Sequence, residues 1–165
     1  MISYDFHLSL VFWLSFVTRA IERVLEERFG PHGIGLQETK VLGCLAMYRE
    51  LSQTELGAMI GIEPSTLVRT LDRMEKSGWV RRHPSSKDRR KNLIRATQRV
   101  EPVWKIIIRE GQKVEKQAIA GISQFELRQL QAVIRRMVRN LQGSSDLPGT
   151  DDRRRKRSEP EHRKS

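Results

Sequence analysis

The chain has 165 residues, enough for one domain with a hydrophobic core. It carries 31 Lys and Arg residues against 20 Asp and Glu residues, and the formal net charge of +11 suits a polyanionic partner, either nucleic acid or an anionic membrane surface. The single cysteine, Cys44, excludes an intramolecular disulfide framework and fits a reducing cytoplasm. The histidines are scattered without metal-ligand spacing, so we expect no metal and no cofactor.

The N-terminal segment HLSLVFWLSFV is strongly apolar. No basic residue precedes it, no small-residue cleavage site follows before Arg19, and it is shorter than the roughly 20 residues that span a bilayer. We therefore interpret it as one face of a helix and expect no membrane association. Apolar residues at steps of four and three predict this helix over about residues 7–29, ended by Gly30 and Pro31. These residues are Leu10, Leu14, Val17, Ile21 and Val24.

A second helix is predicted over about residues 36–48. Its inward-facing residues are Val41, Leu42 and Leu45. A third helix is predicted to begin at Ser52, a favourable N-cap that forms a capping box with Glu55. Leu51 and Leu56 occupy the positions of a hydrophobic staple, which strengthens the prediction of a helix start here.

Gly61 is predicted to end the third helix, and Pro64 suits the first position of a fourth helix that runs as far as Ser77. Gly78 provides the C-terminal stop of that fourth helix. A short strand is predicted to follow Gly78 and to pair with residues 92–96 in an antiparallel hairpin. The order is therefore helix, turn, helix and then a hairpin.

The fourth helix has the composition of a DNA recognition helix. Leu67, Leu71 and Met74 lie on one face and are expected to pack inward. The roughly opposite face offers hydroxyl and guanidinium groups, which can reach base edges and phosphates. The residues predicted there are Ser65, Thr66, Arg69, Thr70 and Arg73. These could instead be ordinary exposed helix residues, but their place before a basic hairpin favours DNA contact.

The predicted hairpin has a strongly basic tip, SSKDRRK. An arginine on such a tip is suited to a narrow minor groove, whose negative potential is enhanced. The cationic residues of the tip are Lys87, Arg89, Arg90 and Lys91. Asp88 is interpreted as a brace that orients a neighbouring arginine and not as a catalytic acid. The alternative is a solvated turn that is merely rich in charge.

Residues 98–121 are predicted to form a long helix whose start is delayed, or whose axis is kinked, by Pro102. Ser123 and Glu126 form a second capping box ahead of a last helix. The apolar residues of that helix are Leu127, Leu130, Ile134, Met137 and Leu141. Residues 143–165 contain almost no apolar residues and are expected to form a disordered basic tail, either a solubilising end or an extra arm for phosphates.

The segments GLQETKVL, LSQTELGAMIGIEPSTLVRTLDRMEKSGWVRR and SSKDRRKNLIRAT resemble the MarR family of winged helix-turn-helix transcriptional regulators. The resemblance covers about residues 8–142 and is closest to the SlyA-type branch. It implies a mainly α fold with a small β-wing and a homodimer. Residues 31–100 would form the DNA-binding lobe, and residues 1–30 and 101–142 would interlock as dimerisation helices.

The same resemblance implies roles for individual residues. Ser65, Thr66 and Arg69 fall where family members read the major groove. Arg90 falls where a wing arginine enters the minor groove, with Asp88 as its partner. The remaining wing contacts, from Lys87 and Arg89, would be made to phosphates.

The chain also departs from its apparent relatives. Thr39 stands where many carry an aromatic residue, and Gly43 stands where the SlyA-type branch has a histidine. Those side chains help to line a crevice for phenolic effectors in the family, so their replacement argues against a phenolic effector here. Binding of another small aromatic or anionic effector is kept as an alternative. After the wing, Ala96 and Val100 replace the Leu and Gly of the L-T-x-x-G pattern that the relatives carry. Cys44 lies among apolar neighbours, which favours an inert, buried thiol.

Three classes of function follow from these observations. The first is a dimeric transcriptional regulator that binds double-stranded DNA at pseudo-palindromic sites whose half-site centres lie roughly 34 Å apart. The second is a non-specific, nucleoid-type DNA-binding protein of the same fold. The third is an enzyme, which is disfavoured because the sequence shows no nucleophile–base pair, metal set or glycine-rich phosphate loop. Either DNA-binding function predicts a cytoplasmic, nucleoid-associated protein.

Overall fold

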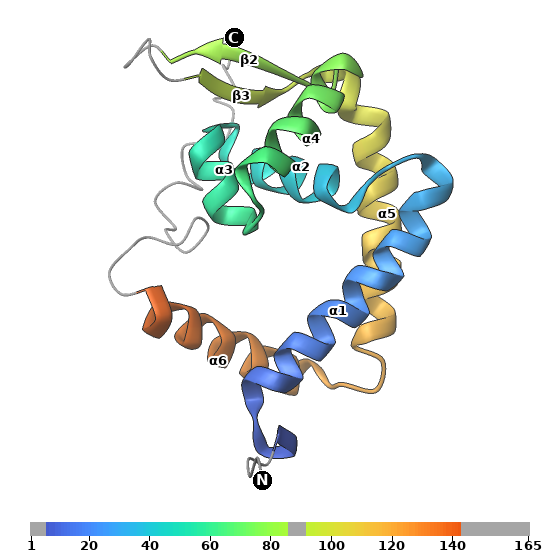
Figure 1. Ribbon diagram of the computed structural model, residues 1–165. Coiled ribbons are helices and arrows are strands. Elements are labelled where there is room, and N and C mark those ends of the chain that lie inside the picture. The colour runs from blue at the N-terminus through green and yellow to red at the C-terminus, as the bar shows by residue number, and fades with distance from the viewer. Residues whose placement is uncertain (1–5, 86–91, 143–165) are drawn as a thin grey trace, which may run out of the picture. The chain divides into compact units, whose positions relative to one another are not determined.

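The computed structural model describes residues 6–85 and 92–142, and the chain divides into two units, residues 1–120 and 121–165. The described part of the first unit contains five α-helices and a three-stranded antiparallel sheet (Figure 1). The described part of the second unit contains one α-helix. The fold is therefore mainly helical with a small sheet, as the sequence predicts. The expected tail at 143–165 lies outside the described residues.

The first long helix, α1, spans Leu10–Phe29 and follows a single 3-10 turn, η1 (Phe6–Leu8). Its N-cap is Ser9, whose side chain accepts a hydrogen bond from the backbone N–H of Phe12 at 3.3 Å. Gly30 ends the helix as predicted, and a second 3-10 turn, η2 (Gly30–His32), carries the chain onward. Along the described part of the chain, no helix combines the length and the apolar composition needed to cross a membrane.

Helix α2 spans Leu36–Tyr48 and α3 spans Gln53–Ile60. The predicted capping box is present, because the Ser52 side chain accepts from the N–H of Glu55 and the Glu55 carboxylate accepts from the N–H of Ser52. Between the two helices lies strand β1, Glu50–Ser52, which the sequence analysis did not predict. Three residues are too few to display the alternation that identifies a strand.

Helix α4 spans Pro64–Lys76, and strands β2 (Val80–Pro84) and β3 (Asn92–Ala96) form the predicted hairpin. The strand order is β1-β3-β2, with both pairs antiparallel. Val80 pairs with Ala96 at the base of the hairpin, and Pro84 pairs with Asn92 at its other end. The loop that carries the basic tip therefore leaves the sheet from the end farthest from α4.

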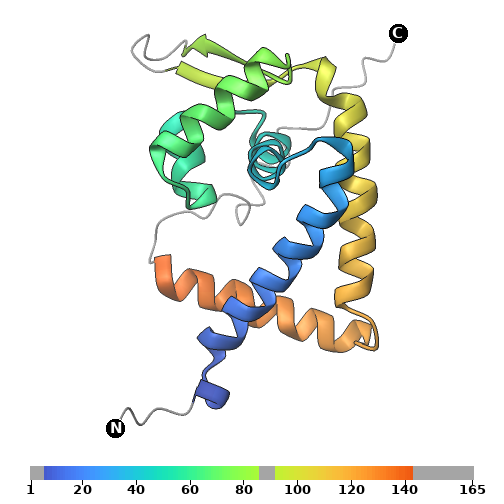
Figure 2. The ribbon, with the colours of Figure 1, turned by 45° about the vertical axis from the view of Figure 1, so that its right-hand side comes forward.

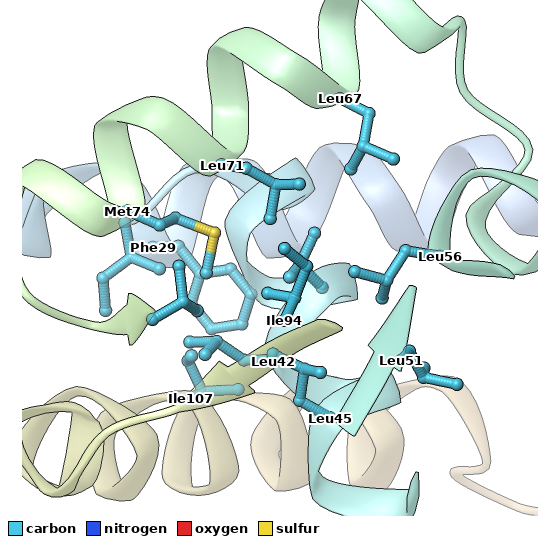
Figure 3. Packing of buried hydrophobic residues seen from close by; sticks show 13 residues of the cluster. Phe29, Leu42, Leu45, Leu51, Leu56, Leu67, Leu71, Met74, Ile94 and Ile107 are labelled. Atoms are coloured by element: carbon cyan, nitrogen blue, oxygen red, sulfur yellow. The ribbon is translucent and has the colours of Figure 1, made fainter. Parts of the chain in front are cut away.

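One hydrophobic core joins α2, α3, α4, the sheet and the first half of the helix that follows the sheet, α5 (Glu101–Ala118) (Figure 3). The inward-facing residues predicted for α2 and α4 are all buried in it. Leu51 and Leu56, the predicted staple, are buried as well. The core's fully buried side chains include Phe29, Leu42, Leu56, Leu67, Leu71, Met74 and Ile94. Helix α4 is thus held along one side by apolar contact.

Helix α5 spans Glu101–Ala118 and follows a 3-10 turn, η3 (Gln98–Val100). Pro102 lies in its first turn, so it delays the helix start and does not kink it. Ile107 of α5 is part of the core, whereas the C-terminal half of α5 runs beside α1 (Figures 1 and 2). The described region of the first unit thus consists of a compact lobe and a pair of long helices that leave it.

In the second unit, α6 spans Gln124–Gln142. The predicted capping box is again present, with the Glu126 carboxylate accepting from the N–H of Ser123 at 2.8 Å and the Ser123 hydroxyl accepting from the N–H of Glu126 at 3.2 Å. The hydrogen bonds from Ser123 lower the pKa of Glu126. Much of the apolar seam of α6 is exposed, including Leu130, Ile134 and Leu141.

Candidate nucleic-acid interface

Helices α3 and α4 form a helix-turn-helix with a three-residue connection. Gly61 ends α3 in the left-handed conformation at φ 69°, which costs glycine little and other residues more. Pro64 occupies the first turn of α4, as predicted. No side-chain hydrogen bond caps the start of α4 among the described residues, and the first N–H groups of a helix have no partner within the helix itself. Such an end is favourable for a phosphate oxygen.

The outer face of α4 presents the polar residues expected of a recognition helix. Ser65, Thr66 and Arg69 are exposed, while the opposite face is buried in the core. The side chains within the first two turns are therefore free to approach another molecule. Their hydroxyl and guanidinium groups can donate hydrogen bonds to base edges or to phosphates.

Thr70 does not belong to this exposed face, and the prediction that placed it there is wrong. Its side chain is 1% exposed. Each residue turns the helix by roughly 100°, which places Thr70 within about 60° of Leu67 on the side that faces the core. The buried stripe is therefore wider than the large apolar residues alone indicate, and the Thr70 hydroxyl is not accessible to DNA.

Arg73 is exposed, but its guanidinium is already engaged by Glu38 of α2. The Nε and Nη2 atoms of Arg73 donate to the same oxygen, Glu38 Oε1, at 3.1 and 2.7 Å. The glutamate is 8% exposed, and a buried carboxylate requires such a partner. Gly35 makes room for it, since a Cβ atom there would lie 2.1 Å from Glu38 Oε2. Arg73 therefore ties α4 to α2.

A second set of ion pairs ties α4 to the hairpin. Arg82 on β2 donates to Asp72 at 2.6 Å and to the carboxylate of Glu75, and the Arg82 backbone N–H donates to Glu75 at 3.1 Å. Burial on its own lowers the pKa of Arg82, but the hydrogen bonds to Asp72 and Glu75 outweigh burial and raise it. The hairpin is thereby held in a definite position against the recognition helix.

The predicted wing residues Lys87, Asp88, Arg89, Arg90 and Lys91 lie outside the described residues. The strands that flank them are described, and Pro84 faces Asn92 in register where the loop departs. In the described ranges 6–85 and 92–142, no cluster of His, Cys, Asp and Glu is arranged to hold a metal ion.

Residues 34–91, which contain the helix-turn-helix and strand β2 of the hairpin, match the MarR family. The solved structure of the transcriptional regulator PA3341 is 30% identical, and the match covers 81% of this chain and 98% of that one with a TM-score of 0.74. This chain belongs to the MarR family.

Two further solved structures share the MarR-family fold. A MarR-family transcriptional regulator from Silicibacter pomeroyi is 19% identical, with 86% of this chain and 96% of that one covered and a TM-score of 0.77. A mutant of E. coli MarR complexed with operator DNA is 23% identical, with 82% of this chain and 99% of that one covered and a TM-score of 0.65.

Within this MarR-family lobe, the structure adds two residues that the sequence analysis missed. Val68 is exposed on α4 beside Arg69, and its methyl groups are suited to the C5-methyl group of thymine. Val68 could have been found from the sequence, because it is an apolar residue that does not follow the three-four spacing of the buried face of α4. The role of Glu38 could not have been found in this way, because 35 positions of sequence separate it from its partner Arg73.

Proposed function

We propose that this chain is a sequence-specific DNA-binding transcriptional regulator that acts as a homodimer on pseudo-palindromic sites. The observation that carries the proposal is the two-sided construction of α4. One side is buried in the core and braced by Arg73 and Arg82, while the other presents Ser65, Thr66 and Arg69 beside an uncapped helix start. A rigidly held helix with an exposed polar face can enter the major groove without reorganisation.

Each group has a role in this proposal. Arg69 donates to a base edge, while Ser65, Thr66 and the N–H groups of the first turn bind a phosphate or a nearby base. Val68 lies where it can contact a thymine methyl group. In the wing, we assign the minor groove to Arg90 with Asp88 as its brace, and phosphates to the other cations. These are Lys87, Arg89 and Lys91.

MarR-family membership supports DNA binding, because an E. coli MarR mutant was solved with operator DNA. The net charge of +11 supports the same class of partner. We also propose the SlyA-type branch, on the strength of the segment IGIEPSTLVRTLDRMEKSG. A regulator that works on DNA in this way would be found at the nucleoid.

The homodimer is supported by apolar surface on both long terminal helices. On α1, Trp13, Phe16 and Val17 are each more than half exposed. On α6, Phe125, Leu130 and Leu141 are exposed. A soluble protein rarely leaves such rows uncovered, so a second copy is the natural cover. Two-fold symmetry would then repeat the half-sites at roughly one DNA turn, about 34 Å.

Thr39 and Gly43, where the chain departs from its relatives, bear on the proposed effector. Thr39 uses its hydroxyl to donate to the Gly35 carbonyl at 3.0 Å, and a Cβ atom at Gly43 would meet no atom within 4 Å. Neither position therefore presents a group that would recognise a phenolic ligand. A small aromatic or anionic effector bound elsewhere remains compatible with the proposal.

The test is selection of duplexes from a random pool, followed by anisotropy titration of the selected site and a scrambled duplex. We expect a selected palindromic motif and a clear preference for it. Arg69→Ala should weaken binding to that motif by about 1–3 kcal/mol, because a bidentate base contact is worth that much. Lys116→Ala, an exposed cation far from α4 on α5, is the matched control. Equal affinity for selected and scrambled DNA would favour the non-specific, nucleoid-type function instead.

A further inference from the structure

A hollow of about 680 Å³ lies at the base of the hairpin and is lined by residues from the C-terminal end of α4, the first residues of β2, the last residues of β3 and η3. We call it the basic hollow. Its lining residues are Glu75, Gly78, Val80, Arg81, Arg95, Ala96, Thr97, Gln98 and Arg99. It lies at the other end of α4 from Ser65, roughly 15–20 Å along the helix, and is therefore separate from the proposed base-reading surface.

Three arginine residues line the basic hollow. Arg81 and Arg95 are directly opposite each other in the β2–β3 pair. The Arg99 side chain lies over Gly78, where a Cβ atom would meet Arg99 Cδ at 3.0 Å and Nη1 at 3.2 Å. None of these guanidinium groups makes a hydrogen bond or an ion pair to another residue in the part of the chain that the structure describes.

Two carboxylates lie near the basic hollow. Glu75 lines it but is bound by Arg82. Glu50 is the register partner of Arg95 on the other side of β3, and its carboxylate lies 3.3 Å from His83 Nε2. Arg82 balances only one of the two carboxylates of Asp72 and Glu75, and Glu50 lies beside Arg95, so the three guanidinium groups still leave an excess of positive charge at the basic hollow. Like charges directly opposite in a sheet are destabilising, so Arg81 and Arg95 have an electrostatic cost that a bound anion would remove.

We propose that the basic hollow binds a phosphate group. Guanidinium groups bind phosphate through paired N–H donors, and a dianionic phosphate compensates two of the three charges. The volume also admits a phosphate that is attached to a larger molecule. That phosphate comes either from a free phosphorylated small molecule or from the backbone of bound DNA. The assignment goes beyond the proposed function, because the first source does not require DNA at all.

Binding of a free phosphorylated small molecule is tested by calorimetric titration of sodium pyrophosphate into the full chain at fixed ionic strength. We expect saturable binding that weakens by at least about tenfold in the double variant Arg81→Gln, Arg95→Gln. The control is Arg23→Gln, Lys116→Gln, which removes the same charge at exposed sites on α1 and α5 and should bind as wild type does. Circular dichroism verifies that each variant is folded, and Arg99→Gln provides a second, independent variant.

The DNA source is tested by titrating duplex DNA against the same variants at several salt concentrations. If the phosphate belongs to DNA, the double variant should have a lower affinity than the control for both the selected and the scrambled duplex, and the loss should be the same for the two. The slope of log affinity against log salt should also fall by about 1 to 2. Either result supports the site and identifies its source. Pyrophosphate binding that is absent or unchanged in the variants, together with DNA affinity equal to the control's, would overturn it.

Discussion

Cys44 lies on α2 with its side chain half-buried, and burial raises the pKa of its thiol above the ordinary value. The thiol is therefore less deprotonated near neutral pH than a free cysteine. The sequence analysis expected a buried, inert thiol, and the structure shows a half-buried thiol whose pKa is raised. A reagent can therefore reach the sulfur, but only a small fraction of the thiol is in the reactive thiolate form.

We expect iodoacetamide to alkylate native Cys44 several-fold more slowly than Cys44 in the urea-unfolded chain, measured by mass spectrometry at matched pH. Unfolding removes the burial that raises the thiol pKa, so the rate should increase with it. A native rate equal to or faster than the unfolded rate would show an activated thiol and contradict this expectation.

Thr70 shows where sequence reasoning fails for a single side chain. Large apolar residues at 67, 71 and 74 locate the centre of the buried stripe correctly. Its width depends on how closely α2 and the sheet approach α4, which a sequence pattern does not contain. A small polar residue at the margin of the stripe can therefore be either buried or exposed.

At the scale of helices and strands, the ion pair between Arg73 and Glu38 joins α4 to α2. Glu38→Gln should destabilise the fold by about 1–2 kcal/mol, less than a fully buried pair because the Arg73 side chain is 63% exposed. It should also weaken operator binding, because the recognition helix loses a brace. Urea unfolding and anisotropy titration measure the two effects.

A double-mutant cycle with Arg73→Gln separates the brace from a direct DNA contact. If Arg73 acts only through Glu38, the double variant should bind DNA no worse than either single variant. Additive losses would instead show that Arg73 also contacts DNA on its own.

Glu110 of α5 is the corresponding link to α1. Its carboxylate is buried and accepts from Lys113 at 2.9 and 3.1 Å and from Arg109 at 2.9 Å, and it lies 3.6 Å from Arg28 Nη1. Hydrogen bonds from Lys113 and then Arg109 lower the pKa of Glu110 to about 2. Because the folded state holds the ionised form, this carboxylate stabilises the fold above its unfolded pKa of about 4.5.

Glu110→Gln should therefore lower the urea midpoint at pH 7. The difference from wild type should stay constant down to about pH 5.5 and shrink as the pH falls towards 3, because the wild-type stabilisation is lost between the unfolded and folded pKa values. Glu115→Gln, an exposed position on the same helix, is the control. A difference that does not depend on pH would refute the electrostatic origin.

The element boundaries were largely predictable, because they depend on local chemistry. Both capping boxes, the glycine stops and Pro64 act within a few residues of sequence, and the helices begin and end near the predicted positions. The braces were not predictable. Arg73 and Arg28 find their carboxylates far away along the chain, and only the packing of the helices brings them together.

At the scale of the whole molecule, the proposed homodimer would bury the apolar surface of the long helices. Val17 of α1 is 51% exposed, so Val17→Glu should introduce a charge into the proposed dimer contact and shift the protein to monomers in sedimentation velocity. Operator affinity should fall with it, because one lobe contacts only one half-site. Ser15→Glu, on the other side of the same helix, should leave the dimer intact. A dimeric Val17→Glu protein would remove this surface from the interface.

Helix α5 is unbroken, and its links to the lobe and to α1 lie close together near its middle. Its first half packs into the lobe through Ile107, and its second half is secured to α1 through Glu110. The nine residues that lead from its start to Glu110 extend for about 13 Å. A tilt of about 15° where α5 meets α1 would move the start of the helix by about 3.5 Å, which equals the 3.4 Å step between stacked nucleotides. A slight change in one helix crossing would thus act as a lever and move the lobe off its base pairs.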